Sequence, residues 1–178
     1  MKTLTLLRHS KSSWADRGQA DRDRPLNARG RAAARAMGGE MARLGLGFDR
    51  VVASPARRVA ETLSRIAERY GPLAPAENED VYLASVATLL AIVRESDDGQ
   101  DRQLIVGHNP GMERLALLLS REGPLRDEVA VKYPTGALAE LSFDAARWSA
   151  VGEGAGTLTR FIRPRDLDPE LGPDEDSD

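Results

Sequence analysis

The chain has 178 residues, of which 41% are hydrophobic and 30% are charged. Such a length and composition predict one soluble globular domain with a core of its own. The 25 basic and 28 acidic residues give a net charge of −3, which argues against a nucleic-acid partner. Because there is no cysteine, disulfides, thiol catalysis and cysteine-based metal sites are excluded.

The apolar segments of the chain are too short to enter a membrane. No apolar run approaches the roughly 20 residues that span a bilayer. The run Leu4–Leu7, between Lys2 and Arg8, is also too short for a signal peptide. We therefore expect a cytoplasmic protein without a membrane partner.

Short apolar runs alternate with helical patterns along most of the chain. Strands are predicted at Thr3–Leu7, Val51–Ala53 and Gln103–Val106. Helices are predicted over Asn27–Leu44, from the Ser54-Pro55 cap to Tyr70, over Ser85–Glu95, and from Asn109-Pro110 to Leu119. The polar segment Ser10–Pro25 is predicted to be an exposed loop, whereas Asp80–Leu83 fits either a short edge strand or an extended loop.

This alternation of strands and helices predicts an α/β fold with three layers, α/β/α, around a mostly parallel central sheet. Ala137–Phe143 and Thr157–Ile162 are candidates for later, antiparallel strands. From Arg165 onward, seven acidic residues oppose one basic residue. We therefore expect a domain over residues 1–164 and an acidic, disordered tail over residues 165–178.

The two histidines of the chain each follow a buried strand. His9 comes after Leu6-Leu7-Arg8, and His108 comes after Ile105-Val106-Gly107. The carboxyl ends of parallel strands line the ligand crevice of an open α/β sheet, so both imidazoles are expected at one edge. The Ser54-Pro55 junction should reach the same edge and present the first turn of its helix. Free N–H groups and the helix dipole favour an anion there.

Two arginines of that first turn differ in their predicted orientation. At about 100° per residue, Arg58 lies roughly 110° from the centre of the apolar stripe and Arg57 roughly 150°. Arg57 also stands four residues before Glu61, a spacing typical of a solvated surface pair. Together with both histidines, Arg8 and Arg58 predict a phosphate site. Imidazole can attack phosphorus, and guanidinium groups bind phosphoryl oxygens.

Each of these residues also has a structural interpretation. A histidine after a strand can be a hydrogen-bonded core residue, Arg8 an ordinary salt-bridge partner, and Asn109-Pro110 only a helix start. Lys11 and Trp14 could contact a substrate, but solvent exposure of Lys11 and a packing role for Trp14 fit equally well. The expected placement of both histidines at one edge favours the functional interpretation.

Three motifs, in this order and spacing, resemble the histidine phosphatase (phosphoglycerate mutase-like) superfamily. They are Leu7-Arg8-His9-Ser10, the segment from Ser54 to Thr62, and Val106-Gly107-His108-Asn109-Pro110-Gly111. Within the family, the chain is most similar to the small bacterial phosphohistidine phosphatases. The resemblance runs from residue 2 to about residue 167 and includes Arg24–Gly30 and Phe161–Pro164. It implies a phosphoglycerate mutase-like fold.

The resemblance also implies a role for each site residue. His9 matches the nucleophile, which becomes a transient phosphohistidine, and His108 matches the second histidine, which stabilises the transferring group. Arg8 and Arg58 match the arginines that clamp the phosphoryl oxygens, and water then releases inorganic phosphate. The scheme requires neither a metal nor another cofactor.

The sequence departs from the family pattern at two points. The residue after the nucleophile is commonly glycine, whereas here it is Ser10, which is less able to adopt a positive φ. Many members also carry an acid that protonates the leaving oxygen. Glu79 and Asp80 are the candidates for this acid, although a solvated loop position explains them better. A missing acid suits phosphohistidine better than an alkyl phosphate ester, because imidazole can depart protonated.

We therefore expect a metal-independent phosphatase acting through His9 on a phosphorylated protein, with phosphohistidine as the favoured substrate. A phosphatase for a small phosphorylated molecule is the first alternative. A mutase is disfavoured because the short chain has little room for a substrate-enclosing insertion. A non-catalytic phosphate-binding module is the other alternative, but binding alone would not need a free nucleophilic imidazole.

Overall fold

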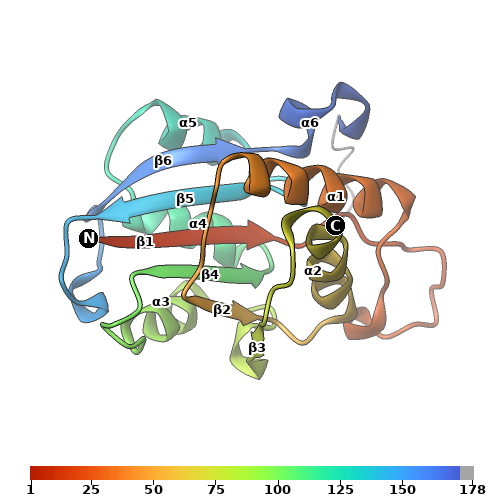
Figure 1. Cartoon of the computed structure of the whole chain (residues 1–178). Coiled ribbons are helices and arrows are strands. Elements are labelled where there is room, and N and C mark those ends of the chain that lie inside the picture. Colours follow the sequence, from red (N-terminus) through yellow and green to blue (C-terminus); the bar gives the residue numbers. More distant parts are fainter. Residues whose placement is uncertain (173–178) are drawn as a thin grey trace.

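A mixed six-stranded sheet forms the centre of the computed structural model, which describes residues 1–172 (Figure 1). Its strands are β1 (Lys2–Arg8), β2 (Arg50–Ala53), β3 (Ala76–Glu77), β4 (Arg102–Gly107), β5 (Leu138–Phe143) and β6 (Gly156–Ile162). The strand order is β3-β2-β4-β1-β5-β6. The first four strands in this order are parallel, and β5 and β6 continue the sheet in antiparallel pairing. The mostly parallel sheet and the two late antiparallel strands are therefore confirmed.

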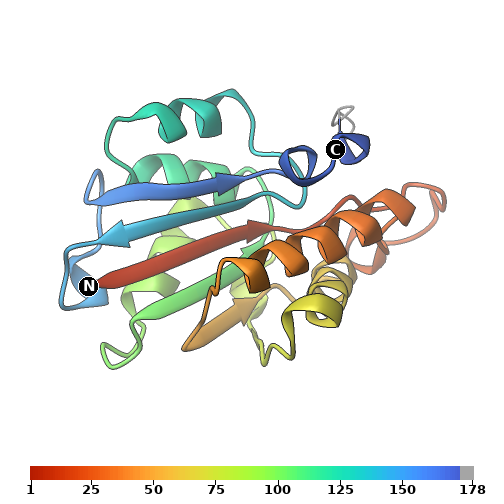
Figure 2. The ribbon, with the colours of Figure 1, turned by 45° about the horizontal axis from the view of Figure 1, so that its top comes forward.

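Helices cover both faces of this sheet (Figure 2). They are α1 (Ala28–Arg43), α2 (Arg57–Tyr70), α3 (Val86–Arg94), α4 (Gly111–Leu119), α5 (Pro124–Val131) and α6 (Pro164–Leu167). α1 and α2 pack on one face, and α3, α4 and α5 pack on the other. The expected three-layer α/β/α architecture is confirmed. None of the helices in residues 1–172 combines the length and the apolar character needed to cross a bilayer.

β1 lies between β4 and β5 and is covered on both faces, which explains its nearly continuous apolar sequence. Leu4 and Leu6 contribute to the core beneath α3 and α4, whereas Leu7 contributes to the core beneath α1 and α2. In the parallel ladder of β1 and β4, Arg8 stands opposite Gly107. The residues that follow these two strands therefore leave the sheet side by side.

Two helices begin later than their sequence patterns predict. α2 begins at Arg57, with Ala56 as its N-cap in an extended conformation, and not at Pro55. α4 begins at Gly111 and not at Pro110. The Ser54 hydroxyl, predicted to cap α2, instead bonds to His108 Nε2 at 2.8 Å and accepts from the Ala56 N–H at 3.3 Å. The hydroxyl of Ser54 thus links the backbone before α2 to the imidazole of His108.

Two further segments differ from the prediction. The edge strand is Ala76–Glu77, and the segment predicted as Asp80–Leu83 instead begins within a 3-10 turn, Glu79–Val81, capped by Asn78. The Asn78 side chain accepts from the Asp80 N–H and so starts the turn directly after the strand, and the buried Val81 side chain holds the turn against the core. α5 has no counterpart in the prediction, because Val129 is its one fully buried residue and gives it no periodic apolar stripe.

The predicted acidic tail is ordered over its first half. Residues 165–172 include the end of α6 and a 3-10 turn, Pro169–Leu171, so the prediction of disorder is wrong for them. Asp166 accepts from the Arg163 N–H at 2.8 Å and pairs with its guanidinium at 2.9 Å, and the Leu171 side chain is buried. These contacts outweigh the acidic composition. The rest of the predicted tail, residues 173–178, lies outside the described residues.

Candidate active site

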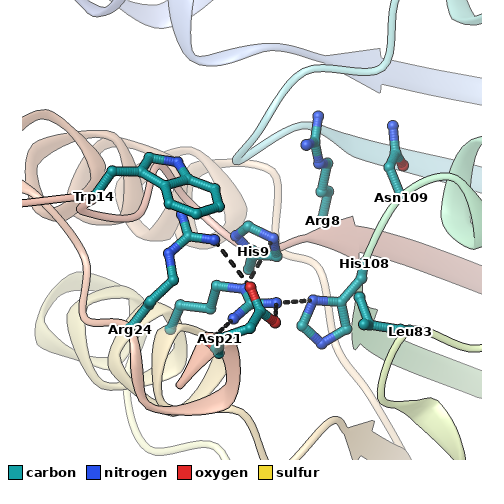
Figure 3. A pocket seen from close by; sticks show the side chains of 9 residues that line it. Arg8, His9, Trp14, Asp21, Arg24, Leu83, His108 and Asn109 are labelled. Atoms are coloured by element: carbon teal, nitrogen blue, oxygen red, sulfur yellow. Dashed lines mark hydrogen bonds and ion pairs between the residues drawn. The ribbon is translucent and has the colours of Figure 1, made fainter. Parts of the chain in front are cut away.

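A cavity of about 150 Å³ opens beyond the carboxyl ends of β1 and β4 (Figure 3). It is lined by Arg8, His9, Trp14, Asp21, Arg24, Arg58, Leu83, His108 and Asn109. The structure therefore brings together all four residues predicted from the three motifs. The ring centroids of His9 and His108 lie 5.1 Å apart. Glu79 and Asp80 are not among the lining residues.

The imidazole of His9 is held in one tautomer. Its Nδ1 lies 2.8 Å from the backbone oxygen of Ser10, which can only accept, so Nδ1 carries the proton. The lone pair is then on Nε2, which accepts from Arg58 Nε at 3.3 Å. Burial, together with the charges of neighbouring side chains, lowers the pKa of His9 well below its ordinary value. His9 is thus a neutral imidazole with a nucleophilic nitrogen beside the cavity.

His108 is also neutral, in the opposite tautomer. Arg58 Nη2 lies 3.2 Å from Nδ1, and because guanidinium only donates, Nδ1 is an acceptor. Nε2 therefore carries the proton and donates to Ser54 Oγ at 2.8 Å. Burial, and after it the charge of Arg58, lowers the pKa of His108 to about 3. Tyr82 packs edge-on against the ring, with centroids 5.4 Å apart.

Arg58 connects the two histidines, as its predicted orientation requires. Its side chain is buried in the first turn of α2, whereas Arg57 is exposed and pairs with Glu61 at 2.8 Å. The predicted orientations of Arg58 and Arg57 are therefore confirmed. The position of Arg58 relative to His9 is fixed by Thr62, whose hydroxyl donates to the Arg58 backbone oxygen at 2.6 Å. The same hydroxyl accepts from the Ser10 N–H at 3.0 Å.

Arg8 lies on the other side of His9. Its Nη1 donates to the backbone oxygen of Tyr133 at 3.0 Å, and Asn109 Nδ2 donates to the same oxygen at 3.0 Å. Ser10, which replaces the family's usual glycine, is buried without a positive φ, since Leu83 is the one non-glycine residue of the described chain with such a φ. The serine therefore fits this backbone without strain.

Glu79 lies outside the cavity in a solvent-exposed ion pair. Its carboxylate accepts from Arg22 at 2.6 and 2.8 Å, and the bond to Arg22 lowers its pKa. Asp80 is likewise exposed. The carboxylate that does line the cavity is Asp21, in a 3-10 turn, Asp21–Asp23, of the segment predicted as an exposed loop.

Asp21 is held by three donors. Arg58 Nη2 and Arg24 Nη1 each donate to it at 3.0 Å, and the Tyr82 hydroxyl donates at 2.6 Å. Partial burial raises its pKa, but these hydrogen bonds prevail and lower the pKa to about 2. Asp21 is therefore ionised at neutral pH and serves as an acceptor.

Arg24 is a third cavity arginine that the sequence motifs did not indicate. Its guanidinium lies 3.2 Å from the ring centroid of Trp14, and it donates to Ser12 Oγ at 2.5 Å. Three guanidinium groups and one carboxylate thus surround two neutral imidazoles, an arrangement that favours a multiply charged anion. Within residues 1–172, no three His, Asp or Glu side chains are grouped to hold a metal ion.

Residues 4–81 match the model of the histidine phosphatase superfamily (branch 1). An uncharacterized protein of Mycobacterium tuberculosis is 33% identical over 164 residues, covering 89% of this chain and 100% of the relative. An uncharacterized protein of Mycobacterium leprae is 32% identical over 167 residues, with the same coverage of both chains.

Solved structures share the whole architecture. A protein from Nakamurella multipartitia, provisionally named phosphohistidine phosphatase SixA, superposes with a TM-score of 0.78 at 27% identity, covering 92% of this chain and 96% of that one. A protein of the same provisional name from Agrobacterium tumefaciens gives 0.79 at 26% identity, with coverage of 92% and 98%. A phosphoserine phosphatase from Entamoeba histolytica, at 17% identity and a TM-score of 0.63, covers 94% and 100% and shares the fold.

Proposed function

Because this chain belongs to the histidine phosphatase superfamily and is a phosphatase of that family, we propose that it hydrolyses protein phosphohistidine through a covalent intermediate on His9. The observation that carries the proposal is the tautomer of His9. The Ser10 carbonyl holds the proton on Nδ1 and leaves a lone pair on Nε2, beside three guanidinium groups. A site that only bound anions would not need this lone pair.

In the first step, His9 Nε2 attacks the phosphorus atom of the substrate. The bond from phosphorus to the substrate nitrogen breaks, and a bond from phosphorus to Nε2 forms. Arg8 and Arg58 bind the phosphoryl oxygens, and the oxygens replace the ring nitrogens as partners of Arg58. The Nδ1–H of His9 keeps its hydrogen bond to the Ser10 carbonyl, and this carbonyl oxygen stabilises the cationic ring of the intermediate.

His108 neutralises charge on the transferring group. The negative charge of a phosphoryl dianion raises the pKa of His108 above the value of about 3 that burial and the charge of Arg58 give it. The ring then takes up a proton from solvent on Nδ1 and donates a hydrogen bond from this N–H to a phosphoryl oxygen, and the proton returns to solvent when phosphate leaves. Its Nε2–H continues to donate to Ser54, which keeps the ring in place.

In the second step, water attacks the phosphorus atom and both of its protons end on the released dihydrogen phosphate. The bond to Nε2 breaks, and its electron pair returns to the ring. The cycle thus restores neutral His9 with its proton on Nδ1, and no other acid or base is consumed.

The protonation state of Asp21 favours phosphohistidine over an ester. An alkoxide leaving group needs a proton from a nearby acid. The carboxyl group that lines the cavity has a pKa of about 2 and carries no proton at neutral pH. Imidazole needs no such acid, because its ring can be protonated at the nitrogen remote from phosphorus before the bond breaks.

Incubation with a phosphohistidine-bearing phosphocarrier protein and with p-nitrophenyl phosphate tests the proposal, with His9→Ala as the variant. We expect dephosphorylation of the phosphocarrier by the native protein and a loss of about 10⁴-fold or more in His9→Ala. A brief reaction with radiolabelled substrate, stopped with alkali, should trap phosphohistidine on the native protein alone.

Each other outcome identifies an alternative. Turnover of the ester without turnover of the phosphocarrier would assign a small-molecule phosphomonoesterase. No turnover of either, with retained binding of inorganic phosphate, would assign a binding module. Equal turnover by His9→Ala would exclude the covalent mechanism, provided that circular dichroism shows the variant to be folded.

A further inference from the structure

The cavity has a buried floor and an open mouth. On the floor, His9, Arg58 and His108 are 5%, 3% and 3% exposed. At the mouth, the Asp21 side chain is 43% exposed, and Trp14 and Leu83 are 54% and 56% exposed. Phosphoryl transfer places the attacking and leaving atoms on opposite sides of phosphorus. A substrate attacked from the floor by His9 therefore has its leaving group at the mouth.

Asp21 is the group at this mouth that can recognise a leaving group. A carboxylate accepts about four hydrogen bonds, and Asp21 receives three, from Arg58, Arg24 and Tyr82. It therefore keeps acceptor capacity on an exposed side chain. The flanking Trp14 and Leu83 side chains are exposed and largely apolar, so Asp21 is the one charged side chain among the exposed residues that line the cavity.

We propose that Asp21 is a specificity-determining residue that accepts a hydrogen bond from the N–H of the protonated phosphohistidine ring, the N–H that lies on the nitrogen remote from phosphorus. This inference rests on the proposed function and identifies the substrate feature that the enzyme selects. A phosphate ester has no such N–H, and the lone pairs of its leaving oxygen would be repelled by the carboxylate. A phosphohistidine ring that is protonated at the remote nitrogen presents an N–H, to which a charge-assisted hydrogen bond forms.

The transfer is then nearly symmetric between two imidazoles. On the enzyme side, the Nδ1–H of His9 donates to the Ser10 carbonyl at 2.8 Å. On the substrate side, the N–H remote from phosphorus donates to Asp21. When the bond between phosphorus and nitrogen breaks, its electron pair stays on the leaving nitrogen. The substrate ring departs as neutral imidazole with that same N–H proton, while the ring of His9 becomes cationic.

Asp21→Asn tests this assignment, with Asp23→Asn as a matched control. Asp23 lies in the same turn but is exposed and does not line the cavity. We expect Asp21→Asn to lower kcat/KM for the phosphocarrier by about 10- to 100-fold, the range for a hydrogen bond to a charged group. Its affinity for tungstate, measured by calorimetry, should equal or exceed that of the native protein, because a negative charge has been removed.

A different result overturns the inference. If turnover and tungstate affinity fall together, Asp21 only positions Arg58. If the phosphocarrier is turned over as fast as by Asp23→Asn, the ring N–H is not recognised. Both results leave the proposed function intact, whereas failure of the native protein to dephosphorylate the phosphocarrier overturns the proposed function and this inference together. Asp21→Ala, which cannot donate a new hydrogen bond, serves as a second variant with the same expectations.

Discussion

The floor and the mouth of the cavity are built from different kinds of structure. On the floor, His9 and His108 follow adjacent parallel strands, and Arg58 occupies the first turn of a helix packed on them. At the mouth, Asp21 and Trp14 belong to the connection between β1 and α1, and Leu83 follows a 3-10 turn. The floor is therefore fixed by the topology of the sheet, whereas the mouth depends on local turns. The floor suits general phosphoryl chemistry, and the mouth suits the choice of leaving group.

The largest difference in kcat between matched variants is expected for Arg58, on the floor, and its exposed neighbour Arg57. We expect Arg58→Ala to lower kcat by about 10²- to 10³-fold, because a guanidinium that stabilises transition-state charge is lost. Arg57→Ala removes only an exposed ion pair with Glu61 and should change kcat by less than about twofold. Steady-state kinetics on the phosphocarrier measures both. Equal losses of kcat would contradict the proposed role of Arg58 in binding the phosphoryl group.

Two glycines of α1 test how tightly this helix packs on the connection between β1 and α1, which carries Trp14 and Asp21. An added Cβ at Gly30 would overlap the backbone carbonyl of Lys11, whereas one at Gly39 would meet only the Arg69 side chain at 3.6 Å. We expect Gly30→Ala to lower the free energy of unfolding by about 1–3 kcal/mol. Gly39→Ala should raise it by up to about 1 kcal/mol. Urea denaturation measures both, and similar values would contradict the tight approach at Gly30.

The burial of the floor histidines predicts how stability depends on pH. In the unfolded chain a histidine binds a proton below about pH 6.5. In the folded protein His108 has a pKa of about 3, and the pKa of His9 is also lowered, so both stay neutral. The unfolded state therefore binds more protons, and the free energy of unfolding should fall between pH 6.5 and 5. Each fully titrating histidine contributes about 1.4 kcal/mol per pH unit.

Urea denaturation at pH 7.5, 6 and 5 measures this slope. His108→Gln should reduce the slope by about half, because glutamine does not titrate and His9 still does. A free energy of unfolding that is constant from pH 7.5 to 5 would mean that the floor histidines are protonated in the folded protein. The proposed nucleophile would then be blocked at the acidic end of the range.

The smallest change in kcat is expected for two acidic residues outside the mouth of the cavity. Glu79 is paired with Arg22 and Asp80 is exposed, and neither lines the cavity. Glu79→Gln and Asp80→Asn should each change kcat for the phosphocarrier by less than about twofold. A loss of kcat of tenfold or more in either variant would restore that residue as a candidate acid. The residue would then have to move into the cavity during the reaction.

Sequence periodicity located the floor because its geometry follows from regular elements. Apolar runs place His9 and His108 at strand ends, and helical spacing distinguishes Arg58 from Arg57. The mouth residue Asp21 could not be found in this way. It stands in the run Asp21-Arg22-Asp23-Arg24, which is typical of a solvated loop, and its position depends on contacts with Arg58 and Tyr82, far along the chain.

Thr62 links the segment that follows β1, next to the proposed nucleophile His9, to α2, which carries Arg58, through one oxygen atom. Its hydroxyl accepts from the backbone N–H of Ser10 and donates to the backbone oxygen of Arg58. The spacing between attacking nitrogen and guanidinium is thus preorganised. The entropy of aligning these groups is lost during folding, so it does not have to be lost again in each catalytic cycle.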